Sequence, residues 1–448
     1  MNRRMLILLL LPVLLLSCRE DGETLFLRQV VQDPLMAQVD SMAQALAATG
    51  FNAGSVYKEV WIRDFNTFVA LSLTVCDTAQ VRDALETFLD FQGPEGDIPD
   101  AFVSDVDTNA VHYHYRYSRA RPRLAAHKNT VETDQESSLV QAVRQYVDRT
   151  GDVAWLTSVR GGKTVLAHLE DAMGYLRKHK WDDGYGLITG ATTADWGDVQ
   201  PEHGWGVEID ENTHYTVDIY DNAMFVLALD DLAALCRTAG ADSLAAPWTA
   251  LKEGVCANVR AHLWDPERQK FHPHLYLAGS PFPADLDEEA IWYHGGTAVA
   301  ALAGLLSPEE VAATHARMLE HVAAAGAQSV GLTLYPAYPS GTFANPMMGA
   351  YQYQNGGDWT WFGARWIRAL VQNGMLQEAY DALRPMLQRV VDHGGFYEWY
   401  KLDGTPVGSG TYRGTAGVLF SASEALRAAA CQRLGTQQGI SVPATERK

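Results

Sequence analysis

Two aromatic, glycine-containing segments of the chain carry carboxylates in settings that suggest catalysis. The first reads ATTADWGD over residues 191–198 and places Asp195 and Asp198 on either side of a tryptophan. The second reads GGFYEWY over residues 394–400 and surrounds Glu398 with aromatic side chains. Cleavage of a glycosidic bond needs two carboxyl groups, one to protonate the leaving oxygen and one to activate water or attack directly. Aromatic faces also suit sugar rings, so the segments are candidates for the two halves of such a pair. An aspartate turn in the first and a structural ion pair in the second are the alternatives.

The acid of such a pair needs a raised pKa, which an apolar neighbourhood provides. Asp195 follows the small residues 192–194 and precedes Trp196, whereas Asp198 lies where the loop becomes polar. The sequence therefore predicts Asp195 as the general acid, Glu398 as the second catalytic carboxylate, and Asp198 as a contact to sugar or water.

The rest of the chain is dominated by helical periodicity, and strand-like alternation is scarce. Apolar residues recur at three- and four-residue spacing in about twelve segments. These segments lie near residues 34–49, 61–75, 78–92, 133–149, 163–179, 216–238, 243–262, 293–304, 307–325, 358–372, 376–392 and 414–432.

These segments alternate in character along the chain. Every second one begins with an unusual polar or aromatic sequence, such as WIRD at 61–64, and is rich in small and apolar residues. The others carry more charge. Because a helix that is apolar around most of its circumference is buried, the alternation predicts an all-α fold, an (α/α)6 toroid whose inner helices begin at one rim. An irregular solenoid is the alternative, but the sequence shows no repeat of fixed period.

The order of the unusual segments resembles the six-hairpin glycosidases. The closest likeness is to glycoside hydrolase family 63, the related mannosylglycerate and glucosylglycerate hydrolases, and the neutral invertases. The segments are WIRDF (61–65), GDIPD (96–100), TDQES (133–137), ADWGD (194–198), YQNGGDWTWFGA (353–364) and GGFYEWY (394–400).

The resemblance implies roles for particular residues. The general acid is an aspartate of the central loop, here Asp195 or Asp198, and the general base is Glu398. The resemblance also implies a set of sugar-binding residues, which are Trp61, Arg63, Asp64, Asp100, Asp134, Trp196, Asp198, Gln354, Asn355, Trp359, Trp361 and Tyr400. Thr133 and Glu136 also fit a helix capping box, which leaves Asp134 open between a capping role and a site role.

The expected activity is that of an exo-acting, inverting glycoside hydrolase on α-linked glucosides or mannosides. The central loop departs from the Gly-Trp-Asp of several relatives, and the large extra domains of many family 63 enzymes are missing, so the substrate stays open. A carbohydrate-binding protein without activity is one alternative. Another is a lyase, unsaturated-uronyl hydrolase or epimerase on the same toroid, for which Arg63, Arg365 and Arg413 would bind a uronate.

The composition of the chain limits the kinds of partner and ligand that it is expected to bind. The formal net charge is −19, and no basic patch is present to neutralise phosphates, so nucleic acid is not an expected partner. The histidine pairs at 112 and 114 and at 272 and 274 lack a third ligand at suitable spacing. We expect no metal and no cofactor, and a carbohydrate as the substrate. The sequence does not indicate an oligomeric state.

The N-terminus resembles a bacterial lipoprotein signal. Two arginines precede an apolar run that ends in Leu15-Leu16-Ser17-Cys18, and the run is shorter than the ~20 residues of a membrane-spanning helix. Residues 1–17 are therefore expected to be a signal peptide, with Cys18 as the site of lipidation. We expect residues 18–33 to form a tether and residues 34–448 a single catalytic domain in the bacterial cell envelope, attached to the membrane only by the lipid.

Overall fold

The computed structural model describes residues 21–108, 113–128, 131–204, 207 and 209–437. Within this part of the chain, an inner ring of helices is made of α3 (Ile62–Ser72), α5 (Gln135–Thr150), α8 (Ile219–Thr238), α10 (His294–Leu302), α12 (Thr360–Gln372) and α14 (Arg413–Gln437). Each packs against the next along the chain, and α14 packs against α3, so the ring is closed.

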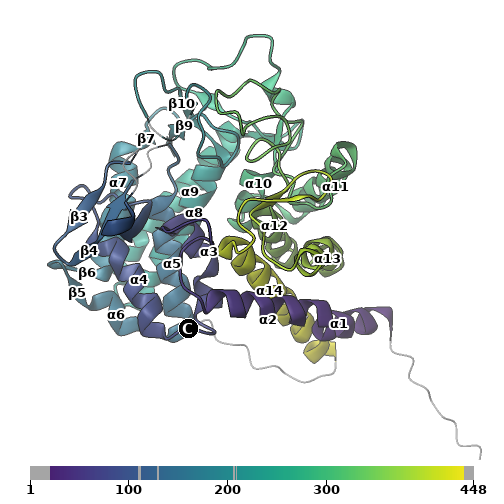
Figure 1. Ribbon diagram of the computed structural model, residues 1–448, viewed down its shortest axis with the longest axis horizontal. Helices are drawn as coiled ribbons and strands as arrows, with labels where there is room; N and C mark the ends of the chain where they lie inside the picture. The colour runs from purple at the N-terminus through teal and green to yellow at the C-terminus, as the bar shows by residue number, and fades with distance from the viewer. Residues whose placement is uncertain (1–20, 109–112, 129–130, 205–206, 208, 438–448) are drawn as a thin grey trace, which may run out of the picture.

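An outer helix precedes each inner one in the chain. The outer helices are α2 (Pro34–Ala47), α4 (Thr78–Asp90), α7 (Val165–His179), α9 (Asp242–Asn258), α11 (Pro308–Ala325) and α13 (Leu376–His393). Figure 1 shows α4, α11 and α13 on the periphery of the ring. The predicted (α/α)6 toroid is confirmed.

The burial of the helices follows from their sequences. Helix α8 buries its first eight residues, from Ile219 to Val226, and so is enclosed on every side there. Outer helix α13 instead buries Leu376, Ala379, Leu383 and Leu387, which lie on one face at three- and four-residue spacing. The alternation seen in the sequence therefore reflects two different degrees of burial.

Helix α1 (Gly22–Gln32) differs from the prediction for this region. Its Leu27 and Val30 are fully buried, and the helix packs against α14, beside which it lies in Figure 1. Most of the stretch predicted as a tether thus belongs to the folded body. The predicted signal peptide and Cys18 lie outside the described residues. Within the described part, no helix is long and apolar enough to cross a membrane.

Short antiparallel ribbons precede several inner helices. One sheet has the order β1-β2-β4-β3 and pairs Trp61 with Ala101, which holds the start of α3 beside the segment that leads towards α5. With two to seven residues each, these strands are too short to give a visible alternation in the sequence. Their bounds are β1 Val60–Trp61, β2 Ala101–Ser104, β3 Arg116–Ser118, β4 Arg121–His127, β5 Val159–Arg160, β6 Lys163–Thr164, β7 Trp181–Asp182, β8 Leu187–Ile188, β9 Gly190–Ala191, β10 Tyr215–Val217, β11 Trp264–Asp265, β12 Lys270–Phe271, β13 Leu275–Tyr276, β14 Trp292–Tyr293, β15 Leu334–Tyr335, β16 Trp399–Tyr400 and β17 Pro406–Val407. Short helices α6 (Val153–Thr157), η1 (Asp105–Asp107), η2 (Val259–Leu263) and η3 (Glu288–Ala290) complete the described elements.

Candidate active site

A cavity of about 220 Å³ lies where the inner helices begin. It gathers residues from the starts of α3 and α12 and from the connecting segments, which are far apart in the sequence. The predicted site residues that line it are Trp61, Arg63, Asp64, Asp100, Trp196, Asp198, Gln354, Trp359, Trp361 and Glu398. The toroid therefore brings most of the predicted site together at one rim.

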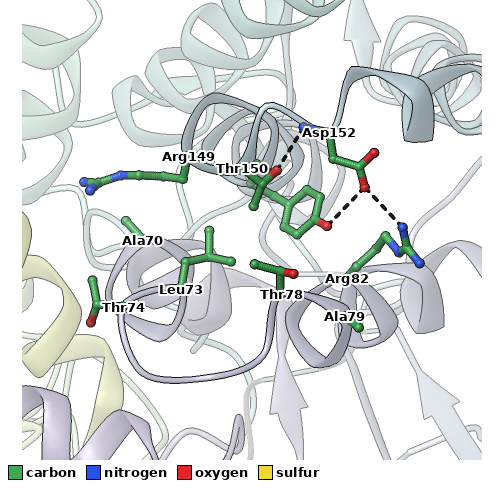
Figure 2. A pocket seen from close by; sticks show the side chains of 10 residues that line it. Ala70, Leu73, Thr74, Thr78, Ala79, Arg82, Arg149, Thr150 and Asp152 are labelled. Carbon is green, nitrogen blue, oxygen red and sulfur yellow. Dashed lines mark hydrogen bonds and ion pairs between the residues drawn. The ribbon is translucent and has the colours of Figure 1, made fainter.

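A larger depression, of about 710 Å³, lies where α3 and α5 end (Figure 2). The Asp152 carboxylate there accepts hydrogen bonds from Arg82 (3.1 Å) and from the Tyr146 hydroxyl (3.3 Å). Its only lining carboxylate is thus engaged by its neighbours, and no second carboxylate among the described residues lines the depression. This surface lacks the pair that acid–base chemistry needs.

Glu398 reaches the cavity from the segment that follows α13. That helix ends at Gly394 in the left-handed conformation, after which the chain turns into β16. The carboxylate accepts hydrogen bonds from the Tyr57 hydroxyl (2.8 Å) and the Ser409 backbone N–H (3.2 Å). Burial raises the pKa of Glu398 to about 7, although these two hydrogen bonds favour the ionised form and oppose the rise. Glu398 therefore exchanges a proton near neutral pH.

Asp198 lines the same cavity from the central loop. Its Oδ1 accepts a hydrogen bond from the Gln354 side-chain amide (2.6 Å), and its backbone N–H donates to Gln354 Oε1 (3.2 Å). This two-point contact fixes the backbone and the carboxylate together. Gln354, predicted as a sugar contact, therefore also positions Asp198.

Asp195 is placed differently from the prediction. It adopts a left-handed backbone conformation (φ 58°) and is only 2% exposed. Its Oδ1 accepts a hydrogen bond from the Gly296 N–H (2.8 Å) at the start of α10, and it does not line the cavity. Burial raises the pKa of Asp195 well above its ordinary value. Asp195 does lie in an apolar neighbourhood, as the sequence indicated. Its carboxyl group, however, is bonded to the start of α10 and does not face the cavity.

Arg63 organises one wall of the cavity. Its guanidinium contacts Glu132 (2.6 Å) and Asp134 (2.6 Å), and all three residues are buried. Asp134 also accepts a hydrogen bond from the Tyr220 hydroxyl (2.7 Å) and does not itself line the cavity. The capping role considered for Asp134 does not occur, because its side chain makes no cap hydrogen bond. Asp134 instead lies behind Arg63 and holds it in place.

Two further carboxylates face the cavity from neighbouring elements. Burial raises the pKa of Asp64 to about 6, although a hydrogen bond from the Tyr412 hydroxyl opposes the rise. Burial also raises the pKa of Asp100 to about 7, and the negative charges of Asp134 and Asp198 add to the effect. The cavity thus contains several acids with unusually high proton affinity.

Tryptophans form one wall of the cavity. The Trp196 ring packs edge-on against Trp359 (4.7 Å between ring centroids) and Trp361 (5.4 Å). Arg365 stacks on the Trp361 ring, 4.4 Å from its centroid, and does not line the cavity. Aromatic packing of this kind fixes the rings in place and leaves little conformational freedom at the wall.

Several buried polar atoms of the cavity residues have no hydrogen-bond partner among the described residues. They are Nε1 of Trp61, Trp196 and Trp361, Nη2 of Arg63, Oδ2 of Asp100 and Oε2 of Glu132. Unpaired buried polar atoms are rare because each costs roughly 1–3 kcal/mol. Donors and acceptors mixed in this way match a ligand with many hydroxyl groups. In the described part of the chain, no group of three His, Cys, Asp or Glu residues is arranged to hold a metal ion.

The family is shown by a match over most of the chain. The model of the mannosylglycerate hydrolase MGH1-like glycoside hydrolase domain matches residues 57–415. The chain belongs to this family. It is a glycoside hydrolase, as the resemblance of its motifs implied. A sequence comparison with curated proteins gave no significant match.

Solved structures share the fold of this glycoside hydrolase. The GH63 mannosylglycerate hydrolase from Thermus thermophilus in complex with glucose has a TM-score of 0.59 and 17% identity over 87% of this chain and 99% of that one. The same enzyme with Tris and D-glycerate gives 0.60 and 18% over 87% and 100%. A GH78 family rhamnosidase of Bacillus sp. GL1 gives 0.58 and 15% over 87% of this chain and 34% of that one.

Two predicted sugar contacts of the hydrolase lie behind the cavity. Asn355 hydrogen-bonds the backbone of Tyr338 at both its N–H (2.9 Å) and its C=O (3.0 Å), and so closes a turn. The Arg389 guanidinium lies over the Tyr400 ring, 3.8 Å from its centroid. Neither Asn355 nor Tyr400 lines the cavity. Both support the backbone that carries the residues facing the cavity.

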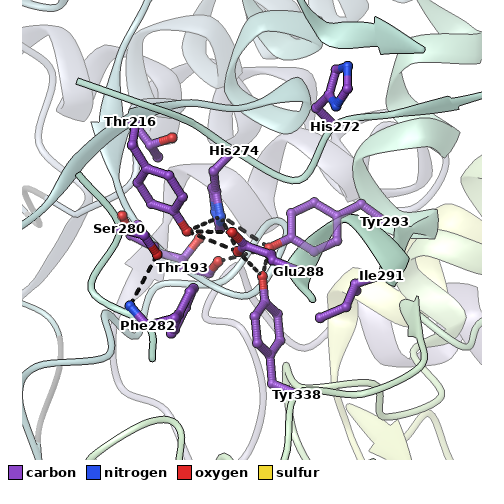
Figure 3. A network of polar contacts seen from close by, with 12 residues as sticks. Thr193, Thr216, His272, His274, Ser280, Phe282, Glu288, Ile291, Tyr293 and Tyr338 are labelled. Carbon is purple, nitrogen blue, oxygen red and sulfur yellow. Dashed lines mark hydrogen bonds and ion pairs between the residues drawn. The ribbon is translucent and has the colours of Figure 1, made fainter. Parts of the chain in front are cut away.

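A buried polar cluster lies beside the central loop of the hydrolase (Figure 3). At its centre is the Glu288 carboxylate, and burial alone would raise its pKa. Contacts with a histidine and two phenols nevertheless hold the pKa of Glu288 below its ordinary value. These partners are His274 Nδ1 (2.8 Å), Tyr276 OH (2.8 Å) and Tyr338 OH (2.6 Å).

This cluster connects to both segments that fix Asp198. The Tyr293 hydroxyl lies 2.5 Å from the Tyr338 hydroxyl and 3.3 Å from the Thr193 carbonyl, in the loop that leads to Asp198, and its one proton can be donated to either oxygen. Tyr338 in turn bonds Asn355, the residue after Gln354. The cluster therefore supports the Asp198 loop and the turn that carries Gln354 at once.

The sequence did not indicate several residues of the cavity. Tyr57, Tyr113, Glu132, Tyr353 and Tyr412 line it. Tyr412 stands directly before the predicted start of an inner helix, and Glu132 lies next to TDQES, so a closer reading of the inner-helix starts could have found both. Tyr57 lies in an irregular stretch, and the sequence offers no signal for it.

Proposed function

We propose that the protein is an exo-acting, inverting glycoside hydrolase in which Asp198 is the general acid and Glu398 the general base. The observation that carries the proposal is that these two carboxylates line one cavity from two separate segments. The proposal moves the acid from Asp195 to Asp198, because a general acid must reach the leaving oxygen and Asp195 does not line the cavity.

In the proposed reaction, Asp198 donates a proton to the glycosidic oxygen as its bond to the anomeric carbon breaks. Because Asp198 Oδ1 already accepts a hydrogen bond from Gln354, the transferable proton belongs on Oδ2. Glu398 accepts a proton from a water molecule that attacks the anomeric carbon from the opposite face. The hydrogen bonds from Tyr57 and Ser409 stabilise Glu398 in the ionised form that this step requires.

The dimensions and polarity of the cavity support action on a terminal sugar. Its volume is about 220 Å³ and tryptophans wall one side, which suits one end of a glycan better than a continuous chain. The mixed unpaired donors and acceptors suit ring hydroxyls. An α-linked glucoside or mannoside remains the proposed substrate, since a structural neighbour is named a mannosylglycerate hydrolase and was determined with glucose.

Uronate chemistry is less well supported than glycoside hydrolysis of a neutral sugar. Of the three arginines considered for binding a uronate, Arg365 stacks on Trp361 outside the cavity. Arg413 donates to the Asn52 carbonyl (2.6 Å) and also does not line the cavity. Arg63 lines it, but its guanidinium is paired with two carboxylates.

The test of the proposed function is the anomer that forms first. Terminal α-glucosides and α-mannosides are incubated with the enzyme and followed by proton NMR. Inversion requires that the β-anomer appear before mutarotation. Glu398→Gln should lose activity by at least about 10²-fold while keeping its circular dichroism spectrum. First appearance of the α-anomer would refute inversion, and unimpaired turnover by the variant would remove Glu398 from the mechanism.

We also propose that Cys18 is lipidated and anchors the enzyme in the bacterial cell envelope. The proposal rests on the sequence Leu15-Leu16-Ser17-Cys18 after an apolar run. Metabolic labelling with a radioactive fatty acid should mark the wild-type protein and leave Cys18→Ser unmarked. Equal labelling of both proteins would argue against Cys18 as the site.

A further inference from the structure

The wall of the active-site cavity is rich in carboxyl groups. Its lining carboxylates come from α3, from three connecting segments and from the stretch that follows α13. They are Asp64, Asp100, Glu132, Asp198 and Glu398. Those that are ionised lie in a concave, low-dielectric cavity, where they repel a ligand of the same sign.

The one arginine among the described residues of this wall is already engaged. Arg63 contacts Glu132 through Nη2 and Asp134 through Nε, both at 2.6 Å, so its positive charge is already shared between two carboxyl groups. Among the described residues that line the cavity, there is no other lysine or arginine. The undescribed internal stretches 109–112, 129–130, 205–206 and 208 contain neither residue type in their sequence.

A lysine that does not line the cavity, Lys128, is engaged by other groups. The Lys128 ammonium donates to Glu136 (2.8 Å) and to the Ile98 carbonyl (2.9 Å). Burial is the main cause of the raised pKa values of Asp64 and Asp100, so the cavity disfavours a carboxylate that is ionised and gains no partner. A further carboxylate brought in by a ligand would be disfavoured in the same way.

Apolar and aromatic side chains complete the lining. Tyr57, Tyr113, Val199 and Tyr353 contribute to the wall, and the half-exposed Met347 (52%) lies on it as well. An uncharged group can bind to such a surface without the desolvation penalty that an ion would incur there. The surface offers no positive charge to an anionic group.

We propose that this active site selects glycosides whose leaving group is uncharged and discriminates against those whose leaving group carries a carboxylate. This inference rests on the proposed function, because it concerns the substrate of the same site. It separates this enzyme from the mannosylglycerate hydrolase among its structural neighbours, whose named substrate has a carboxylate in its leaving group.

The experiment compares substrates that differ only in that charge. α-Mannosylglycerol and α-mannosylglycerate, and the two glucosyl counterparts, differ by a hydroxymethyl group in place of a carboxylate. We expect kcat/KM to be at least tenfold higher for the glycerol glycoside of whichever sugar is accepted. Equal or faster hydrolysis of the glycerate glycoside would overturn the inference.

A binding measurement keeps this inference separate from the proposed catalysis. Titration calorimetry of Glu398→Gln with the same four compounds reports recognition without turnover. Tighter binding of the glycerol glycosides, even if the wild-type enzyme hydrolyses none of the four, supports the inference while the proposed reaction fails. Equal or tighter binding of the glycerate glycosides refutes the inference, whatever the enzyme hydrolyses.

A charge variant tests the electrostatic cause. Met347→Arg places a cation on the cavity wall, and Met347→Gln is the matched uncharged control. At low ionic strength, Met347→Arg should reduce the preference for the neutral glycoside at least tenfold, because surface electrostatics are least screened there. Met347→Gln should leave the ratio within threefold of wild type. An unchanged ratio in Met347→Arg would refute electrostatic selection.

Discussion

The two aspartates of the central loop should respond in opposite ways to the same substitution. Asp198→Asn removes the proton donor but preserves its surroundings, because Asn can still accept the Gln354 hydrogen bond at Oδ1 (2.6 Å in the wild type). General acid catalysis contributes ~10²–10⁴-fold, which corresponds to roughly 3–5 kcal/mol of activation free energy. We expect kcat to fall by that factor on alkyl glycosides, with the melting temperature unchanged.

Asp195→Asn should instead affect mainly stability. Asn can adopt the left-handed conformation of this position and keep the Gly296 hydrogen bond at Oδ1. Its amide nitrogen would occupy the place of Oδ2, which has no hydrogen-bond partner among the described residues. Because the raised pKa of Asp195 favours the protonated form, whose Oδ2–H is already unpaired, the amide adds one further unpaired N–H, at a cost of up to about 1–3 kcal/mol. We expect a lower melting temperature and a kcat within about tenfold of wild type.

The assay separates the acid from any other role of Asp198 by changing the leaving group. An aryl glycoside with a very acidic phenol departs without protonation, so Asp198→Asn should approach wild-type turnover on it while remaining slow on the alkyl glycoside. Asp195→Asn should show the same relative activity on both. If Asp195→Asn is the variant rescued by the acidic phenol, the assignment of the acid to Asp198 is wrong. A defect in Asp198→Asn that is equal on both substrates would also refute it.

Three other predictions concern the surroundings of the pair. At pH 8, the free energy of unfolding of Glu398→Gln should exceed that of the wild type by at most about 3 kcal/mol. At pH 5 this difference should be smaller. The raised pKa of Glu398 means that the folded enzyme holds this proton more tightly than the unfolded chain, so wild-type stability falls as the pH rises from about 4.5 to about 7. Chemical denaturation at the two pH values checks this. Tyr57→Phe removes a hydrogen bond to the ionised Glu398 and should raise its pKa, which a shift of the acidic limb of kcat/KM to higher pH would reveal. Tyr293→Phe should lower kcat by about tenfold with KM within threefold, because it loosens the loop at Thr193. Tyr276→Phe, which loses a similar bond without touching that loop, is the control, and an equal effect of both would assign the loss to general destabilisation.

The helices of this fold could be predicted closely because their periodicity reports burial directly. The segment expected near 376–392 is helix α13 (Leu376–His393), and the alternation of inner and outer helices follows from how apolar each one is. The positions of Arg63, Asp64 and Trp361 were accessible for the same reason, since they lie in the first turns of inner helices and the toroid brings those turns together.

Connecting segments gave less information because their structure depends on tertiary contacts. Helix α1 was missed because Leu27 and Val30 are its only buried residues and give a weak periodic signal. Its burial also depends on contact with α14, which is at the other end of the chain. Tyr57 lies in a segment with no periodicity, and only the folded chain brings its hydroxyl to within 2.8 Å of Glu398. The ribbons β1 and β16 are two residues long, too short for alternation to show.

Our proposal of Asp198 in place of Asp195 as the acid has a more specific reason. A general acid must be partly dehydrated, so that its pKa is raised, and it must also reach the leaving oxygen. Apolar neighbours in the sequence indicate only the first condition. Asp195 is buried so completely that its carboxyl group does not reach the cavity. The group accepts a hydrogen bond at the start of α10 instead. Asp198 is less buried, and the Gln354 contact supplies the orientation that its own sequence neighbours do not. The more polar of two neighbouring carboxylates is therefore the better candidate when the other is surrounded by small residues that allow complete burial.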